Sequence, residues 1–173
     1  SLFFFYGWLF GFGYFISSLY WISISLTYDE NFKSLIPLAV ILIPAFLALF
    51  YGLITFFFLI LKPKKIISSF LIFSLIFGVV EFIRGTILTG FPWNLIIYSF
   101  SQQKEFLGIT SIIGTYGLNL FCISLFTSPA IMLLGDKKKI LGFFIFFFIT
   151  VIFFYSYGHY NKEKFYGANS KIY

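Results

Sequence analysis

The chain has 173 residues, of which 60% are hydrophobic and only 10% are charged, and its formal net charge is +6. Soluble domains carry about a quarter charged residues, so this composition excludes a water-soluble globular domain and predicts an integral membrane protein. The basic residues gather in short loops between apolar runs and form no stripe that alternates with aromatics, so the positive charge does not indicate nucleic-acid binding.

Five apolar runs are long enough to cross a bilayer, which requires roughly 20 helical residues. The runs are continuous and do not alternate, and backbone polar groups in lipid must bond within their own segment, so helices are favoured over strands. We therefore predict an all-α membrane domain over residues 1–158, followed by a polar linker over residues 159–173. The predicted spans cover about residues 2–26, 35–61, 66–88, 106–134 and 140–157.

The first and fourth runs are rich in small residues. Gly7 and Gly11 lie four positions apart in the first run, and Gly108, Ser111 and Gly114 follow one another at intervals of three in the fourth. Small side chains allow helix backbones to approach closely in lipid, so we expect tight helix packing along both runs. The last run is bulky and nearly featureless, which is typical of a helix surrounded by lipid.

Lysines in two alternate loops predict the orientation of the chain. They occupy residues 62, 64 and 65, after the second run, and residues 137–139, after the fourth run. Positive charge marks the cytoplasmic side of a membrane protein, so both loops and the N-terminus are predicted to be cytoplasmic. The loops over residues 27–34 and 89–105 and the C-terminal tail would then lie on the outer side of the membrane.

The third run ends with the stretch EFIRGTILTGFPWN, which places Glu81 and the only arginine, Arg84, inside a membrane span. Counted from Ile66 at 1.5 Å per residue, Glu81 lies about 22 Å along the helix, in the outer half of a hydrocarbon core about 30 Å thick. The i,i+3 spacing puts both residues on one helix face, so they can pair. Charged residues at such depth usually face the protein interior or a watery cavity.

The next residues, Gly-Phe-Pro-Trp, cannot continue a regular helix. Pro92 disfavours the helical conformation at Phe91, and Gly90 permits unusual backbone angles. Phe91, Trp93 and Tyr98 suit the aromatic belt at a membrane surface. Two interpretations remain open: a structural ion pair that locks the helix end beneath ordinary aromatic anchors, or an entrance that admits a lipid or lipidated chain sideways from the membrane.

The motif E-x-x-R-G followed by T-G-F-P-W closely resembles the signature of the membrane portion of apolipoprotein N-acyltransferases. Residues 11–26, 43–53 and 108–121 resemble other blocks of that family in order and spacing. The resemblance implies a multi-pass enzyme of the bacterial inner membrane with a periplasmic α/β nitrilase-like domain. Such enzymes transfer an acyl chain from a phospholipid to the α-amino group of a lipoprotein's diacylglyceryl-cysteine. They act through a thioester on the cysteine of a Glu-Lys-Cys triad in the nitrilase-like domain.

The resemblance places that triad outside the present chain, so we expect a part of a longer protein that has no catalytic residue of its own and is inactive alone. Cys122 has no nearby lysine or glutamate that would make a thiolate, and we interpret it as a small core residue. Glu81, Arg84 and residues 90–93 match signature positions near the lipid entrance, and we expect them to give substrate access or to hold the loop. No cofactor and no metal is expected.

The expected partners are a phospholipid acyl donor, a diacylglyceryl lipoprotein acceptor and the membrane, with no nucleic acid. A small transporter or channel subunit is an alternative, but only Glu81, Arg84 and Asn119 could line a path. A membrane anchor without a ligand is another, which would leave the charged pair unexplained. We expect Asn119 to bond a neighbouring helix and His159 to be a polar anchor at the interface.

Overall fold

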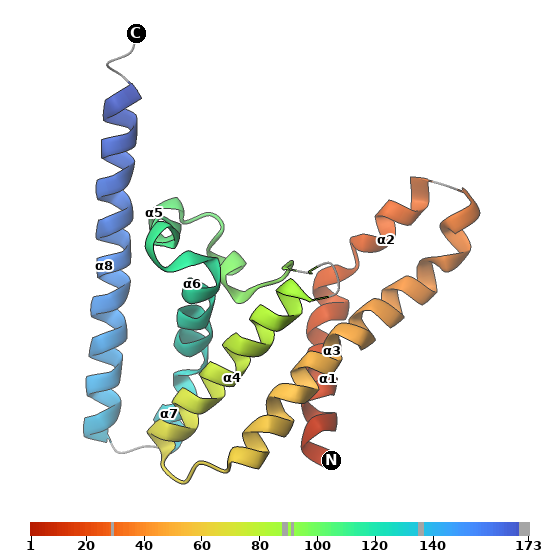
Figure 1. Ribbon diagram of the computed structural model, residues 1–173, viewed down its shortest axis with the longest axis horizontal. Coiled ribbons are helices and arrows are strands. Elements are labelled where there is room, and N and C mark those ends of the chain that lie inside the picture. Colours follow the sequence, from red (N-terminus) through yellow and green to blue (C-terminus); the bar gives the residue numbers. More distant parts are fainter. Residues whose placement is uncertain (29, 88–89, 91, 135–136, 170–173) are drawn as a thin grey trace. The chain divides into compact units, whose positions relative to one another are not determined.

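The computed structural model describes residues 1–28, 30–87, 90, 92–134 and 137–169 (Figure 1). Within these residues the chain forms helices and no strand, and five helical stretches are long and apolar enough to cross a membrane. The predicted all-α fold with five membrane helices is therefore confirmed. The candidate spans are Leu2–Leu19, Lys33–Leu61, Ile66–Thr86, Thr110–Ile131 and Ile140–Lys162.

Two compact units make up the chain, and each is described by itself. Unit 1 comprises Ser1–Lys64 and Leu75–Asn94, and unit 2 comprises Lys65–Ser74 and Leu95–Tyr173. The α-helices are α1 Leu2–Leu19, α2 Ile22–Ser25, α3 Ile36–Leu61, α4 Ile66–Thr86, α5 Lys104–Leu107, α6 Thr110–Thr127, α7 Pro129–Leu134 and α8 Lys137–Asn169. Short 3-10 helices occupy Leu26–Tyr28 (η1), Glu30–Leu35 (η2) and Ile96–Phe100 (η3).

Unit 1 is built on the close approach of α1 to α3. A Cβ atom at Gly7 would lie 2.6 Å from the carbonyl oxygen of Tyr51, and one at Gly11 would lie 2.7 Å from the Cβ of Tyr51. Hydrogen bonds join the two helices as well, because the Trp8 indole donates to the Ala45 carbonyl at 3.0 Å. The small residues of the first run thus serve the tight packing that their spacing predicted.

The first helix ends earlier than the apolar run does. α1 stops at Leu19, and the rest of the run forms α2 and η1 instead of continuing one helix to Leu26. Hydroxyl groups that donate to main-chain carbonyls three or four residues back compete with the regular helical bonds, which favours breaks of this kind. Such bonds are made by Ser17, Ser18, Ser23, Ser25 and Thr27.

Unit 2 has two apolar clusters. One joins Phe70 of α4, Ile131 of α7 and Phe147 of α8. The other joins η3, α5, α6 and α8, and its buried members are Leu95, Ile97, Phe106, Ile109, Leu118, Cys122 and Phe154. Cys122 is fully buried among these side chains. The segment that follows the Trp93 turn is therefore packed into the membrane helices of its own unit.

Glycines set the path of the chain at two places in unit 2. α6 is interrupted at Gly114, where φ is 70° and ψ is 168°, a conformation that is essentially restricted to glycine. A Cβ atom at Gly108 would lie 2.8 Å from the Cα of Gly158, and one at Gly158 would overlap the main chain of Glu105. The short helix α5 can therefore rest on α8 only because residues 108 and 158 have no side chain.

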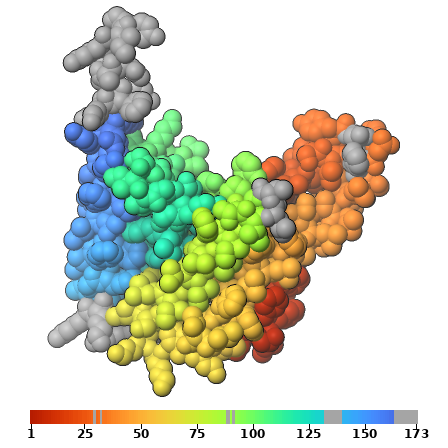
Figure 2. Space-filling view, viewed as in Figure 1, coloured from red at the N-terminus to blue at the C-terminus, as the bar shows by residue number. Residues whose placement is uncertain are grey.

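The last helix is long and largely exposed. α8 continues to Asn169, so the polar segment predicted as a linker from residue 159 extends the helix. Figure 2 shows the α8 side chains, in blue, at the surface along the helix, as expected of a helix that faces lipid. Its bulky exposed residues include Phe146, Phe148, Ile149, Ile152 and Phe153.

Candidate functional site: a buried ion pair beneath an aromatic turn

Glu81 and Arg84 form the ion pair that their spacing predicted. The Arg84 Nη2 donates to Glu81 Oε2 at 2.7 Å, and the Arg84 Nε donates to Glu81 Oε1 at 3.1 Å. Both side chains are 0% exposed, so the pair faces the interior of unit 1. Two parallel bonds between a guanidinium and a carboxylate make this the strong, geometrically specific form of an ion pair.

Aromatic residues of α1 and α3 enclose the pair. The Tyr51 hydroxyl hydrogen-bonds to the Glu81 carboxylate, and the Arg84 guanidinium carbon lies 5.3 Å from the centre of the Phe15 ring. The rings of Phe15 and Tyr51 are in edge-to-face contact, with their centres 5.1 Å apart. Removing one partner from a buried pair leaves an uncompensated charge, which typically costs about 3–5 kcal/mol. The fold of unit 1 is therefore expected to depend on keeping Glu81 and Arg84 paired.

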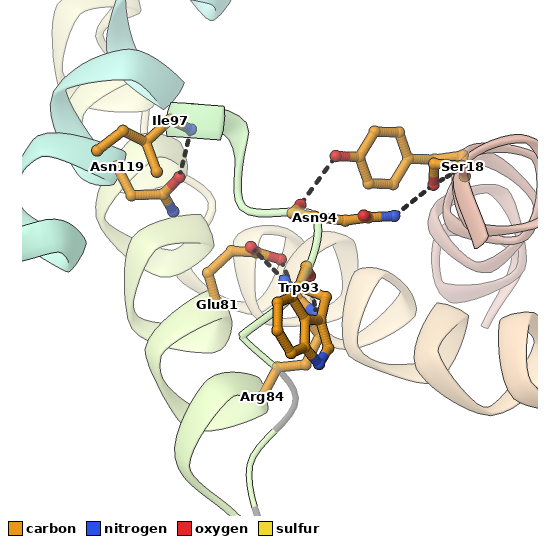
Figure 3. A network of polar contacts seen from close by, with 8 residues as sticks. Ser18, Glu81, Arg84, Trp93, Asn94, Ile97 and Asn119 are labelled. Atoms are coloured by element: carbon orange, nitrogen blue, oxygen red, sulfur yellow. Dashed lines mark hydrogen bonds and ion pairs between the residues drawn. The ribbon is translucent and has the colours of Figure 1, made fainter. Parts of the chain in front are cut away.

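The same guanidinium also holds the turn that follows α4. Arg84 Nη1 donates to the Trp93 carbonyl at 3.1 Å (Figure 3). The chain leaves the helix through Gly90, whose φ is 76°, and a Cβ atom there would lie 2.7 Å from the Gly85 carbonyl oxygen. The predicted helix break is therefore present, and it needs glycine at position 90. Phe91, which was part of the predicted site, lies outside the described residues.

A second set of bonds joins the turn to α1, and the sequence did not reveal it. The Tyr14 hydroxyl donates to the Asn94 carbonyl at 2.9 Å, and Asn94 Nδ2 donates to Ser18 Oγ at 2.6 Å. Asn94 has φ 63°, a left-handed conformation that asparagine adopts more readily than most residues. An asparagine next to Trp93 in a predicted turn was the one available signal.

Trp93 is more exposed than the residues of this network. Its exposed fraction is 54%, whereas Glu81 and Arg84 beneath it are buried. Three nitrogen atoms of Arg84 donate to Glu81 or to the Trp93 carbonyl, so the cation is committed to holding the turn. The arrangement can present an indole ring at the end of a membrane helix in a fixed place, which suits contact with an apolar ligand.

Two further residues considered from the sequence lie elsewhere. Asn119 is in unit 2, where its Oδ1 accepts a hydrogen bond from the Ile97 main-chain N–H at 3.1 Å, so the neighbouring element that it bonds is the short 3-10 helix η3 (Figure 3). His159 is exposed on α8. Among the described residues, no three His, Cys, Asp or Glu side chains group closely enough to hold a metal ion.

Comparison with known proteins decides the family. The family model described as the apolipoprotein N-acyltransferase N-terminal domain matches residues 2–128, which include the ion pair, the turn and all of α6. The chain belongs to the apolipoprotein N-acyltransferase family. This match confirms the family that the E-x-x-R-G and T-G-F-P-W motifs predicted.

Curated apolipoprotein N-acyltransferases show the same relationship. The protein of Brucella melitensis is 37% identical over 134 residues, which cover 77% of this chain and 25% of the relative. The protein of Rhodopseudomonas palustris is 39% identical over 134 residues, and that of Rickettsia prowazekii is 42% identical over 127 residues, with 76% and 71% of this chain covered. The chain spans about a quarter of the length of the curated relatives it matches. No solved structure matches the chain significantly.

Proposed function

We propose that the protein to which this chain belongs transfers an acyl chain from a phospholipid to the N-terminal amine of a diacylglyceryl-cysteine lipoprotein. The names of its relatives support this activity, and the chain provides the membrane part of the enzyme. The catalytic triad then lies in the nitrilase-like domain of the complete protein, and this chain is inactive alone. In this proposal residues 1–158 form the membrane domain and residues 159–173 lead toward that catalytic domain.

The observation that carries the proposal is the exposed Trp93 above a buried, fully bonded ion pair. Glu81 and Arg84 hold the turn and take no part in chemistry, while residues 90–93 contact the lipid. Phe91 is included on the strength of its place in the motif alone. An apolar ring held at the outer end of a membrane helix can guide acyl chains that enter sideways from the bilayer.

The orientation follows from the loop charges. Lysines at residues 62, 64, 65 and 137–139 fall in alternate loops between the spans, and the positive-inside rule makes the side of those loops cytoplasmic. We therefore propose an inner-membrane protein whose Trp93 turn faces the periplasm. Accessibility labelling of single cysteines placed in the two kinds of loop checks this orientation, and a cytoplasmic Trp93 turn would contradict it.

Acyl transfer by the complete protein in lipid vesicles tests the activity, with a phospholipid donor and a diacylglyceryl peptide acceptor. Trp93→Ala and Glu81→Gln are expected to slow transfer by about tenfold or more, since each removes a part that places the lipid. Membrane insertion should be unchanged in both variants. Wild-type turnover in both would remove the assigned site, and no transfer by the wild-type protein would favour a transporter or an anchor.

A further inference from the structure

We propose that Tyr14 and Ser18 of α1 are positioning residues that fix the Trp93 indole for contact with one acyl chain of a phospholipid. They act through Asn94, which both of them bind. The inference rests on the proposed function, because it assigns the ligand of the same turn. It adds to that function a second helix, α1, which carries no charged residue.

The two bonds to Asn94 engage different atoms. Tyr14 binds its main-chain carbonyl, and Ser18 binds its side-chain amide. The Ser18 hydroxyl also donates to the Tyr14 carbonyl at 2.6 Å, so it uses its donor within α1 and keeps a lone pair for Asn94. The hydroxyl is therefore already oriented when the turn docks on the helix.

These bonds matter for Trp93 because its ring is not ordered by burial. The residue has an exposed fraction of 54%, so protein covers only part of it. Its place is set by the main chain, in which the Trp93 carbonyl is held by Arg84 of α4 and the Asn94 carbonyl by Tyr14 of α1. Two successive carbonyls anchored to two helices fix the direction in which the Trp93 side chain leaves the turn.

The surroundings of the ring select an acyl chain over a headgroup phosphate. The last turns of α4 expose Phe82 and Ile83 to 49% and 40%, and Ile87, just after the helix, is 41% exposed, which makes this part of the chain apolar. Arg84, the only cation within the turn and its supports, is buried and bonded to Glu81 and to the Trp93 carbonyl. The chemistry at the surface is therefore that of a hydrocarbon contact.

The test uses the complete protein with fluorinated tryptophan, in phosphatidylethanolamine vesicles that contain some phosphatidylcholine with a nitroxide on its acyl chain. The fluorine resonance of Trp93 is assigned by its loss in Trp93→Phe. We expect strong nitroxide broadening in the wild-type protein. In Tyr14→Phe and Ser18→Ala the resonance should become narrower, because the ring moves more, and its nitroxide broadening should weaken.

Matched controls lie on the same helix. Tyr6→Phe removes a hydroxyl from a tyrosine that is 58% exposed, and Ser17→Ala removes one that donates to the Tyr14 carbonyl within α1. Neither control should change the Trp93 resonance. Ser18→Thr retains a hydroxyl at the same place and should restore the wild-type signal.

Kinetics separate positioning from general damage. Loss of one hydrogen bond that orders the lipid contact should raise the KM for phospholipid about threefold to tenfold with little change in kcat. Asn94→Gly keeps the left-handed backbone and the Tyr14 bond but removes the amide, so it should match Ser18→Ala. The double variant Ser18→Ala/Asn94→Gly should be no worse than either single variant, because both remove the same bond.

An unchanged Trp93 resonance in both Tyr14→Phe and Ser18→Ala would overturn the proposal, as would a fall in kcat with no change in KM. Absence of nitroxide broadening in the wild-type protein would overturn the acyl-chain assignment. If the wild-type protein transfers no acyl chain, the proposed function fails instead, and the resonance measurements still decide whether α1 positions the ring.

Discussion

The two units of this chain are stabilised by opposite means. Unit 1 buries charge, and the carboxylate of Glu81 and the guanidinium of Arg84 are bonded to each other, to Tyr51 and to the Trp93 carbonyl. Unit 2 relies on shape, with clusters of aromatic rings and a glycine contact between Gly108 and Gly158. Its buried Asn119 has an Nδ2 with no hydrogen-bond partner among the described residues. Directional bonds are concentrated where one side chain must be held in place.

Removal of Arg84 should give the largest loss of stability. In Arg84→Met the Glu81 carboxylate stays buried without its cation, so the free energy of unfolding should fall by about 3–5 kcal/mol. The pair Glu30–Lys33 offers a matched control, because it has the same i,i+3 spacing but lies exposed. Lys33→Met should change stability by less than about 1 kcal/mol.

Thermal unfolding of the purified complete protein in detergent measures both changes. A double variant, Glu81→Leu/Arg84→Met, should recover much of the loss, because an apolar pair leaves no buried charge. Equal stability of Arg84→Met and Lys33→Met would show that unit 1 does not depend on its ion pair.

A side chain at Gly158 should give an intermediate loss, because unit 2 depends on close contact. In Gly158→Ala the added methyl overlaps the Glu105 main chain, so α5 must move off α8. Overpacking of this kind costs about 1–3 kcal/mol. Gly142→Ala on the same helix is the control, since nothing lies within 4 Å of a Cβ atom there.

Limited proteolysis of the loop over residues 95–109 reports the displacement, alongside thermal unfolding. Faster cleavage is expected in Gly158→Ala and wild-type cleavage in Gly142→Ala. If the two variants behave alike, the docking of α5 does not depend on the glycine contact.

The smallest effect concerns the surface of unit 2. Lys162 donates to Glu105 at 2.6 Å, and this hydrogen bond lowers the pKa of Glu105 below its ordinary value. A lowered pKa means that the contact stabilises the fold above the pKa of the unfolded state and that this stabilisation is lost as the pH falls through the folded-state pKa. Lys162→Met should raise the pKa of Glu105 toward its ordinary value, and Lys104→Met should leave it unchanged. Carboxyl carbon shifts followed against pH distinguish the two variants.

The sequence could predict the membrane helices and the ion pair because both follow from the cost of burying polar groups in lipid. A glutamate and an arginine three residues apart in a span lie on the same helix face, and charged residues within a membrane pair with one another. The bond between Tyr14 and Asn94 joins residues 80 positions apart, and no local pattern encodes such a contact. A tyrosine in a membrane run is equally compatible with packing or with the interface, so its role becomes visible only once α1 and the turn are placed together.

Helix boundaries were predicted less well where polarity and helix propensity disagree. The residues after 158 are polar but include lysine and glutamate, which favour helices, so α8 extends to Asn169. Serines near the end of α1 have the reverse effect, because Ser17 and Ser18 donate to the main-chain carbonyl of Tyr14. Hydropathy alone marks where lipid ends, which need not be where a helix ends.

The lengths of α1 and α3 have a consequence for the bilayer around unit 1. α1 has 18 residues and α3 has 26, which correspond to about 27 Å and about 39 Å of helix. Only the shorter helix matches a hydrocarbon thickness of about 30 Å. The longer one must tilt or carry its end into the headgroup layer, so this hydrophobic mismatch makes unit 1 sensitive to membrane thickness.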